Sequence, residues 1–317
     1  MAGILRARPT PAPRDVATVC QPSGALPKLV PEPCLAPRYP ALDVPPDLLY
    51  AKAAIVLAAF VAFGLWERLH PAEGGPLLLR LGSATRAGWR RLGRNLSLFG
   101  LNSLLSPLVV LPVTAWAGSF DTGLRPAWWA GWPGLALDVL LLDLWIYGWH
   151  RLNHEWPQLW RFHQVHHLDE TLDTSSAVRF HAGEVLLSAL VRAGVIVALD
   201  VPLPSVVLFE GLVLAASLFH HSDARLPGGL ERALGRVVVT PALHWVHHHA
   251  LRADTDSNYG TIFSFWDPLF GSRSRTRRWR GMPIGVERLR DRPLPRLLLA
   301  PFARQPRANA AAPPARR

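Results

Sequence analysis

The stretch "PGLALDVLLLDLWIYGWHRLNHEWPQLWRFHQVHH" (residues 133–167) joins a long apolar run directly to a segment rich in histidine. The apolar part, residues 133–149, approaches the length at which a helix can cross a bilayer. The following eighteen residues, 150–167, hold five of the thirteen histidines of the chain. An apolar helix that ends in clustered imidazoles predicts a metal site at a membrane boundary.

Four further apolar runs occur in this 317-residue chain, which is 50% hydrophobic and has a positive mean hydropathy. They cover residues 48–69, 96–116, 184–201 and 205–219. The last two flank "PLP" and are predicted to form a helical hairpin; a re-entrant hairpin, or burial against other helices, is the alternative. The sequence therefore predicts an all-α, polytopic membrane helical bundle of about four to five membrane helices with a cytoplasmic histidine-rich helical cap.

Two charged residues, Arg192 and Glu210, lie inside the apolar runs of this hairpin. Charges in such positions are costly in lipid unless they form a pair or face a cavity. Their depths below the hairpin tip differ by about 6 Å at about 1.5 Å per residue. We therefore expect each to face the protein interior separately and consider a cross-hairpin ion pair less well matched.

The net charge of +11 comes from the C-terminal part of the chain. From Gly271 onward there are thirteen arginines against Glu287 and Asp291, so the remainder is balanced. A neutral body with a basic tail fits an anionic membrane surface, or a simply solvated tail, better than a nucleic-acid groove. Nucleic acid is therefore not an expected partner.

The expected domain organisation has three parts. Residues 1–47 form a disordered, Pro-rich extension without signal-peptide features, residues 48–272 a membrane-embedded domain, and residues 273–317 a basic, disordered tail. The two cysteines, Cys20 and Cys34, both lie in the extension. A metal in the core must therefore be held by nitrogen and oxygen ligands.

The arginines between residues 70 and 95 indicate which side of the membrane is cytoplasmic, because short cytoplasmic loops are rich in Arg and Lys. Counting crossings from this loop places every histidine cluster, and the basic tail, on the cytoplasmic side. The strong preference for arginine over lysine, with abundant Ala and Pro, is typical of a GC-rich bacterial genome. We therefore expect an integral, multi-pass protein of a bacterial inner membrane.

The spacing of the histidines predicts two metal ions. His150 and His154 form H-x-x-x-H, which places both on one helix face. H-x-x-H-H occurs twice; its i, i+3 and i+4 positions are expected to share a helix face, while their neighbours can contact a second centre. Eight histidines exceed the four ligands of one zinc site. With His221 or His220 counted as a ninth, the set suits two metals with four or five imidazoles each. The two H-x-x-H-H motifs are His163, His166, His167 and His244, His247, His248.

Imidazole suits zinc, copper, iron and nickel, so ligand type alone does not choose the metal. A redox-active metal pair beside acyl chains makes sense for activating dioxygen against a C–H bond. A zinc-dependent membrane hydrolase and a non-catalytic lipid-binding protein are the alternatives.

Residues 143–271 resemble the membrane-bound fatty acid hydroxylase and sterol desaturase superfamily. The resemblance rests on "DLWIYGWHRLNH", "LWRFHQVHH", "FHHSDARLP" and "TPALHWVHHHALRADTDSNYGTIFSFWDPLFGS". It implies a di-iron, oxygen-dependent lipid hydroxylase or desaturase embedded in membrane helices. Electrons would come from a separate ferredoxin-like or b-type-cytochrome-like protein. The substrate stays open among sterol, carotenoid, ether lipid and fatty acyl chains, as does hydroxylation versus desaturation.

The resemblance also adds ligand candidates. It favours His221 over its neighbour His220 as an intermediate ligand, while His181 in "RFHAGE" is either a ligand or an outer partner. His249 is not expected to be a ligand. The full set of candidate metal ligands is His150, His154, His163, His166, His167, His181, His220, His221, His244, His247 and His248.

Five polar residues are candidates for supporting the ligands. Metal-bound imidazoles usually donate their second N–H to a carboxylate or carbonyl. Asp143 lies too far along the helix face to reach His150, so it either orients a histidine from another segment or packs between helices. Asn258 and Tyr259 either shape the site or only form a turn. The candidates are Asp143, Glu184, Asp254, Asn258 and Tyr259.

Overall fold

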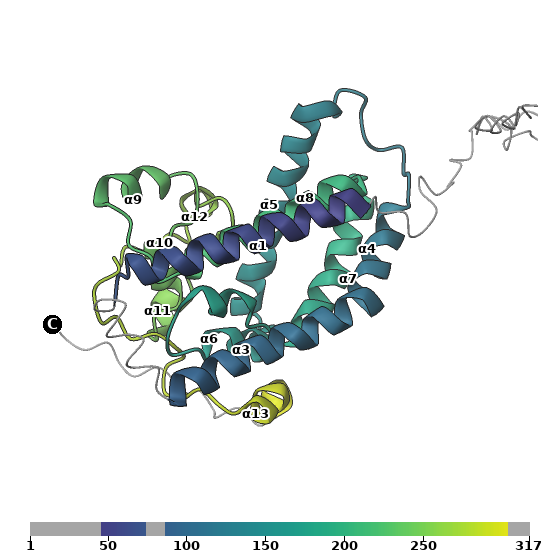
Figure 1. Cartoon of the computed structure of the whole chain (residues 1–317). Helices are drawn as coiled ribbons and strands as arrows, with labels where there is room; N and C mark the ends of the chain where they lie inside the picture. The colour runs from purple at the N-terminus through teal and green to yellow at the C-terminus, as the bar shows by residue number, and fades with distance from the viewer. Residues whose placement is uncertain (1–45, 74–85, 304–317) are drawn as a thin grey trace, which may run out of the picture. The chain divides into compact units, whose positions relative to one another are not determined.

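The computed structural model describes residues 46–73 and 86–303 and shows an all-helical protein (Figure 1). Within these ranges there is no β-strand, and only isolated β-bridges join extended residues. The expected Pro-rich extension, except its last two residues, lies outside the described residues, as do residues 304–317. The fold class predicted from the apolar runs is therefore confirmed.

Four helical segments of the described residues are long and apolar enough to cross a membrane. The first, α1, exposes most of its apolar side chains, as expected for a helix in lipid. The four are α1 (Pro46–Leu69), the continuous segment of α3 (Arg86–Leu105), the π-helical turn η2 (Ser106–Val110) and α4 (Leu111–Gly118), and the hairpin of α7 (Ala182–Leu199) and α8 (Leu203–His221).

The long helix α5 (Gly131–Glu155) contains the apolar run that opened the sequence analysis but is not among these four. Two buried carboxylates, Asp138 and Asp143, lower its hydropathy. Asp138 accepts two hydrogen bonds from Arg125, at 2.8 and 3.0 Å. The helix therefore has a polar interior face and packs against α6, α7 and α8.

The second segment begins earlier than the sequence predicted. The helix starts at Arg86 and not at residue 96, so several arginines assigned to a loop lie on α3. Arg91 pairs with Asp169 at 2.6 Å and with Asp173 at 2.7 Å. These charges are therefore matched by carboxylates of the body of the protein.

The hairpin charges form a cross-hairpin ion pair, contrary to the expectation that each faces the interior separately. Arg192 Nη2 lies 2.6 Å from Glu210 Oε1. The difference in depth is spanned because the arginine side chain is long and flexible. Glu210 also pairs with Lys52 of α1.

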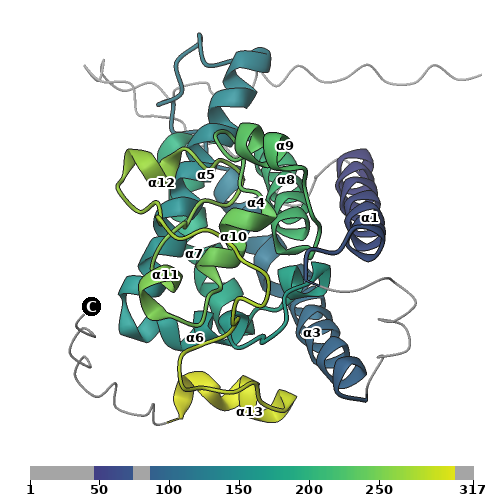
Figure 2. The ribbon, with the colours of Figure 1, turned by 90° about the vertical axis from the view of Figure 1, so that its left-hand side faces the viewer.

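The remaining helices are short and gather on one side of the long ones (Figures 1 and 2). α10 packs directly against α8. The short elements are α6 (Pro157–His167), η3 (Thr174–Val178), α9 (Gly228–Leu234), α10 (Pro241–His247), α11 (Arg252–Thr255), α12 (Trp266–Leu269), α13 (Leu294–Leu299) and η4 (Ala300–Phe302).

Residues 273–303 are packed on this body and do not form the predicted disordered tail. Leu297 and Ala300 belong to a buried apolar cluster with Leu98 of α3 and Val165 of α6. Asp291 lies 2.5 Å from the buried Arg179. Apolar burial and pairing with charges of the body hold this segment, and neither is visible in a count of its arginines.

Candidate metal centre

The ends of four helices bring the histidines together. His150 and His154 lie in the last two turns of α5, which ends at Glu155 just before Pro157 begins α6. Proline at the first position of α6 fits because that position needs no amide donor. The histidines of the second motif (His163, His166 and His167) lie on α6. Those of the third motif (His244, His247 and His248) lie on or just after α10, and His221 is the last residue of α8.

Nine of the eleven candidate ligands form two compact clusters. In each cluster one possible ligand atom per residue lies within 4.8 Å of the corresponding atom of every other member. The five-histidine cluster consists of His150, His154, His163, His167 and His247, and the four-histidine cluster of His166, His221, His244 and His248.

Each H-x-x-H-H motif contributes to both clusters. On α6, His163 and His167 join the five-histidine cluster while His166 joins the other. The third motif divides the opposite way, because His244 and His248 belong to the four-histidine cluster and His247 to the five-histidine cluster. Residues i and i+4 share a helix face, whereas i+3 points to one side of it.

Ring nitrogens inside the clusters face one another at short distances. His150 Nδ1 donates to the Tyr259 carbonyl at 2.9 Å, and His163 Nδ1 donates to Glu184 at 2.7 Å. Burial lowers the pKa of His150 to about 3, so this ring is neutral and its Nε2 bears a lone pair that faces Nε2 of His163. These two Nε2 atoms lie 3.1 Å apart.

The four-histidine cluster has the same arrangement. His166 Nδ1 donates to the Arg179 carbonyl at 3.1 Å, and His221 Nδ1 donates to the Ser217 carbonyl at 2.8 Å. Their Nε2 atoms lie 3.0 Å apart. Facing lone pairs at this distance repel one another unless a cation lies between them.

The donor set fits a transition-metal ion in each cluster. Metal–imidazole bonds are about 2.0–2.1 Å long, so two ligands at right angles on one ion are about 3 Å apart, as are the facing nitrogens. Other ring nitrogens in the clusters are buried without a hydrogen-bond partner among the described residues: His154 Nε2, His167 Nδ1, His244 Nδ1, His247 Nε2 and His248 Nδ1. All-imidazole donors suit iron, zinc, copper or nickel and not the oxygen-seeking ions calcium and magnesium.

Burial keeps these imidazoles in the form that binds metals. It lowers the pKa of His150 to about 3 and that of His154, His167 and His247 well below the usual value. The charged neighbouring imidazoles that protonation would create lower these pKa values further. The rings are therefore neutral at pH 7, with a nitrogen lone pair available.

Two candidate ligands lie outside both clusters. His181 precedes α7, where its Nδ1 accepts from the Gly183 amide at 2.9 Å and its Nε2 lies 3.0 Å from the Leu298 carbonyl. Both of its nitrogens are thus engaged by the backbone. The His220 ring lies tilted against that of His244, with 3.9 Å between centroids, but His220 is not a member of either cluster.

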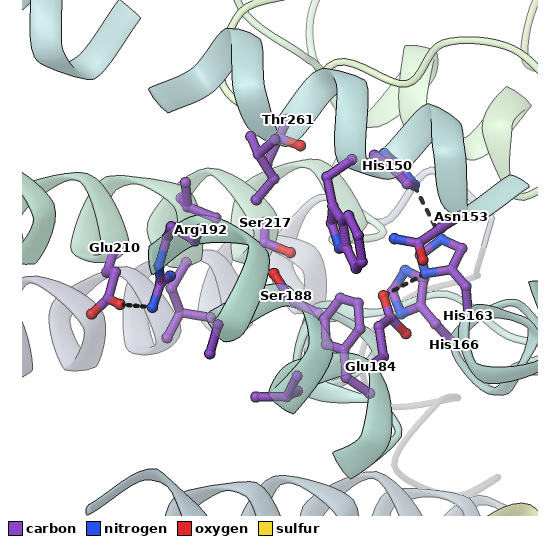
Figure 3. Close-up of a pocket in the computed structure, with 18 of the residues that line it drawn as sticks. His150, Asn153, His163, His166, Glu184, Ser188, Arg192, Glu210, Ser217 and Thr261 are labelled. Carbon is purple, nitrogen blue, oxygen red and sulfur yellow. Dashed lines mark hydrogen bonds and ion pairs between the residues drawn. The ribbon is translucent and has the colours of Figure 1, made fainter. Parts of the chain in front are cut away.

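A cavity of about 320 Å³ lies beside the two clusters. Its walls include the apolar side chains of Ile146, Trp149, Val185 and Leu214. His150, His163, Arg192 and Glu210 also line it, and Figure 3 shows the histidines and the Arg192–Glu210 pair on opposite sides of the view. The clusters therefore border a largely apolar space between helices α5, α7 and α8.

Residues 135–272 match the family model described as fatty acid hydroxylase. This segment is similar to the fatty acid hydroxylase family. It contains all nine clustered histidines and the Asn258–Tyr259 turn. The resemblance inferred from the histidine motifs is thereby confirmed.

Similar proteins are named as lipid hydroxylases. The chain is 30% identical over 202 residues to an ornithine lipid hydroxylase of Rhizobium tropici, covering 63% of this chain and 60% of the relative. It is 34% identical over 146 residues to an alkylglycerol monooxygenase of Danio rerio, covering 45% and 30%. A cholesterol 25-hydroxylase-like protein of Danio rerio is 32% identical over 140 residues, covering 44% and 54%. The chain thus spans less than two thirds of each relative, and no solved structure matches it.

Among the predicted supporting residues, Glu184 contacts a clustered histidine. It accepts from His163 Nδ1, lies in the first turn of α7 and is buried. Tyr259 contributes its carbonyl to His150, and its ring lies 5.2 Å from that of His154. Both residues hold imidazoles in fixed orientations.

Asp143 orients backbone and indole N–H groups and no histidine. Its carboxylate accepts from the amides of Ile262 and Phe263 at 3.0 Å and from Trp266 Nε1 at 2.9 Å. It therefore fixes the loop that follows the "SNYG" turn. Of the two roles considered for Asp143, orienting an imidazole is therefore wrong. The residue lies on the face of α5 that is turned toward this loop.

The other two candidates support the chain around the third motif. Asp254 accepts from His249 Nδ1 at 2.8 Å, and His249 is outside both clusters. Asn258 has a positive φ of 51°, and its side chain donates to the Leu243 carbonyl at 3.1 Å. Asn tolerates this left-handed conformation better than most residues, so Asn258 stabilises the turn that positions Tyr259.

Several partners of the histidines were not predicted from the sequence. The backbone carbonyls of Arg179, Ser217 and Ser257 accept from His166, His221 and His247. A carbonyl carries no signature in the residue type, so no motif could reveal these contacts. Asp256 lies 3.3 Å from His154 Nδ1 and could have been found as an acidic residue close to the third motif.

Proposed function

We propose that this chain is a membrane-bound, di-iron, oxygen-dependent hydroxylase that acts on an alkyl C–H bond of a lipid. The observation that carries the proposal is the pair of buried histidine clusters, with facing nitrogen lone pairs, beside an apolar cavity among membrane helices. The names of the similar proteins, ornithine lipid hydroxylase and alkylglycerol monooxygenase, support a lipid substrate and favour hydroxylation over desaturation.

The overall reaction converts R–H, dioxygen, two electrons and two protons into R–OH and water. Two bound iron ions would supply the reduction of dioxygen and the oxidation of the C–H bond, which amino-acid side chains do not perform. The electrons would come from a separate ferredoxin-like or b-type-cytochrome-like protein.

The residues of the chain hold and orient the reacting groups. The nine clustered histidines would bind the metals, with the second nitrogen of His163 held by Glu184 and that of His166 by the Arg179 carbonyl. Such outer contacts fix the ring orientation and raise ligand basicity. The apolar walls formed by Trp149, Val185 and their neighbours would exclude water and present one carbon of the substrate to the metals.

We further propose that the chain lies in a bacterial inner membrane with the clusters on the cytoplasmic side. Several arginines lie on the side of the molecule that holds the histidines. The Arg278 guanidinium, for example, lies 3.5 Å from the centre of the Trp245 ring of α10. Arg91 and Arg94 of α3 pair with Asp169 and Asp291. An excess of arginine on one side supports a cytoplasmic assignment for that side.

Metal analysis and isotope labelling test the proposal together. We expect one iron in each of the two clusters, and incorporation of a single ¹⁸O atom from ¹⁸O₂ into a host lipid when the purified protein is supplied with a reductant. One zinc per chain without incorporation would favour the zinc-dependent hydrolase. A lipid that loses two hydrogens and gains no oxygen would identify a desaturase.

A further inference from the structure

The segment that joins α12 to α13 crosses the side of the molecule on which the short helices gather (Figure 2). Within residues 273–279 the side chains are alternately exposed and partly buried, as in an extended chain. The exposed positions are Arg273, Arg275, Arg277 and Trp279, and Arg280 directly after them is exposed as well. Arg273, Arg275, Arg277 and Arg280 together form an arginine row.

The partly buried side chains of this segment fix it to the body of the protein. Ser274 Oγ donates to Asp254 at 2.9 Å. Arg278 pairs with the buried Asp223 at 2.9 Å, and its guanidinium lies 3.5 Å from the centre of the Trp245 ring of α10. The arginine row is therefore held outward, over the short helices, on a backbone that is attached from below.

The charges of the arginine row are not matched by carboxylates. Among the described residues, every ion pair made by residues 273–280 belongs to Arg278, which is not a member of the row. Arg273 Nη1 lies 3.5 Å from the Gly235 carbonyl, and the next residue, Arg236, is exposed and adds a further positive charge. Several exposed charges of one sign attract a partner of the opposite sign and speed its association.

Trp279 connects this surface to the four-histidine cluster. Its side chain is 45% exposed, and its ring lies edge-on against the buried His249 ring, with 5.1 Å between centroids. His249 directly follows His248, a member of that cluster, along the backbone. One exposed ring, one buried ring and one peptide thus separate the surface from a candidate metal ligand. The rate of electron transfer falls steeply with distance, so a short route of this kind suits the entry of electrons.

We propose that the arginine row is the docking surface for an acidic electron-carrier protein, and that electrons pass from this protein to the metals by way of Trp279 and His249. This inference rests on the proposed function, which needs two electrons per turnover from a separate protein, and it identifies how that protein is recognised. Each docking would oxidise the carrier by one electron and reduce one ferric ion to the ferrous state. Two dockings would supply the two electrons of the overall reaction.

An anionic membrane surface would attract the same arginines. Two observations favour a protein. The row lies over the short helices, since Arg278 within the same segment packs on Trp245 of α10. The row also adjoins an exposed tryptophan that contacts the neighbour of a cluster histidine, and tryptophan and arginine are the residues most enriched at the centres of protein interfaces.

Binding of a carrier of known charge tests the docking without turnover. Full-length protein in phosphatidylcholine nanodiscs would be mixed with an acidic plant-type ferredoxin, and the association rate would be measured at low and high ionic strength. We expect association to slow as ionic strength rises, because salt screens exposed charges. Hydrogen exchange should locate the contact, with the amides of residues 273–280 protected when the ferredoxin is added.

Charge reversal within the row should weaken docking. Arg275→Glu combined with Arg277→Glu should lower the association rate about tenfold, because two charges that steer the ferredoxin then repel it. Arg288→Glu combined with Arg290→Glu is the matched control. It changes the net charge equally, at exposed positions outside the row that pair with Glu287 and Glu170, and should keep most of the wild-type rate.

Substitution of the tryptophan tests the route. Trp279→Leu removes the ring contact with His249, so the iron should be reduced more slowly at saturating ferredoxin, with iron content retained. Trp89→Leu alters an exposed tryptophan of α3 and is the matched control, which should be reduced as fast as wild type. Stopped-flow absorbance of the ferredoxin measures both rates.

Association that does not depend on ionic strength, or that is equal in wild type and the row variant, would overturn the inference. So would an equal loss in the row variant and its control, which would show an effect of net charge alone. Protection of residues 273–280 by phosphatidylglycerol in the nanodisc, and not by the ferredoxin, would assign the row to the membrane surface instead. A Trp279→Leu protein that is reduced as fast as wild type would overturn the route. These outcomes would leave the hydroxylase proposal intact, since iron content and ¹⁸O incorporation with a chemical reductant are measured separately.

Discussion

The Nε2 atoms of His163 and His150 lie 3.1 Å apart, and the Nδ1 atom of each ring already donates to an oxygen outside the pair. The orientation of these rings indicates a cation site more directly than the spacing of the histidines in the sequence does. These outer contacts turn the two rings so that their Nε2 atoms converge on a common point. Folding therefore prepares a binding site for a cation before the cation arrives.

Removal of a single clustered histidine should empty its site. We expect His166→Ala and His247→Ala, one from each cluster, to abolish iron binding and oxygenase activity, because each removes a buried nitrogen donor. Iron per chain and ¹⁸O incorporation measure the two effects. His249→Ala, outside both clusters, should retain iron; full activity in either of the other variants would contradict the assignment.

The Glu184 carboxylate should raise metal affinity by orienting the His163 imidazole. Glu184→Gln weakens the acceptor that fixes the imidazole, and we expect metal affinity to fall about 10- to 100-fold. Competition with a chelator measures this loss. Glu155→Gln changes a half-exposed carboxylate at the end of α5 and should leave affinity as in wild type. Equal affinities in both variants would show that Glu184 does not orient the ligand.

His181→Ala separates a helix cap from a metal ligand. Its Nδ1 accepts the Gly183 amide at the start of α7, so the substitution should lower the free energy of unfolding by about 1 kcal/mol. Iron content should not change. A lower melting temperature with intact iron is the expected result in purified protein, whereas loss of iron would return His181 to the ligand set.

The C-terminal segment should stabilise the fold through Asp291. Asp291→Asn leaves the fully buried Arg179 without its carboxylate partner, and we expect a loss of about 3 kcal/mol of stability. Chemical denaturation would measure this. Glu287→Gln, at an exposed pair with Arg288, serves as the control, and comparable stability of the two variants would show that the segment is not held by Asp291.

Much of the metal centre could be predicted from the sequence because helices fix the relative directions of nearby side chains. H-x-x-H-H predicted that its three histidines share one helix face with their neighbours at a second centre; the structure does gather them, but it places His166 in a different cluster from His163 and His167. Asp143 was harder to interpret because its partners, the amides of Ile262 and Phe263, are more than a hundred residues away and have no sequence signature.

The limits of sequence prediction were largest for charges. The arginines between residues 273 and 303 indicated a solvated tail, since a count of charges cannot show that Asp291 meets a buried arginine. The Arg192–Glu210 pair was judged poorly matched from helix rise alone. The length of the arginine side chain, which a calculation from helix rise leaves out, allows Arg192 to reach Glu210.

The division of each H-x-x-H-H motif between both clusters has a consequence for assembly. With one ion bound in each cluster, as we propose, α6 and α10 would each hold both ions, so the first ion to bind would already position a histidine of each helix for the second. Uptake should therefore be cooperative, with half-loaded molecules scarce during titration. Because the two H-x-x-H-H motifs share both clusters, the protein would hold either both metals or neither.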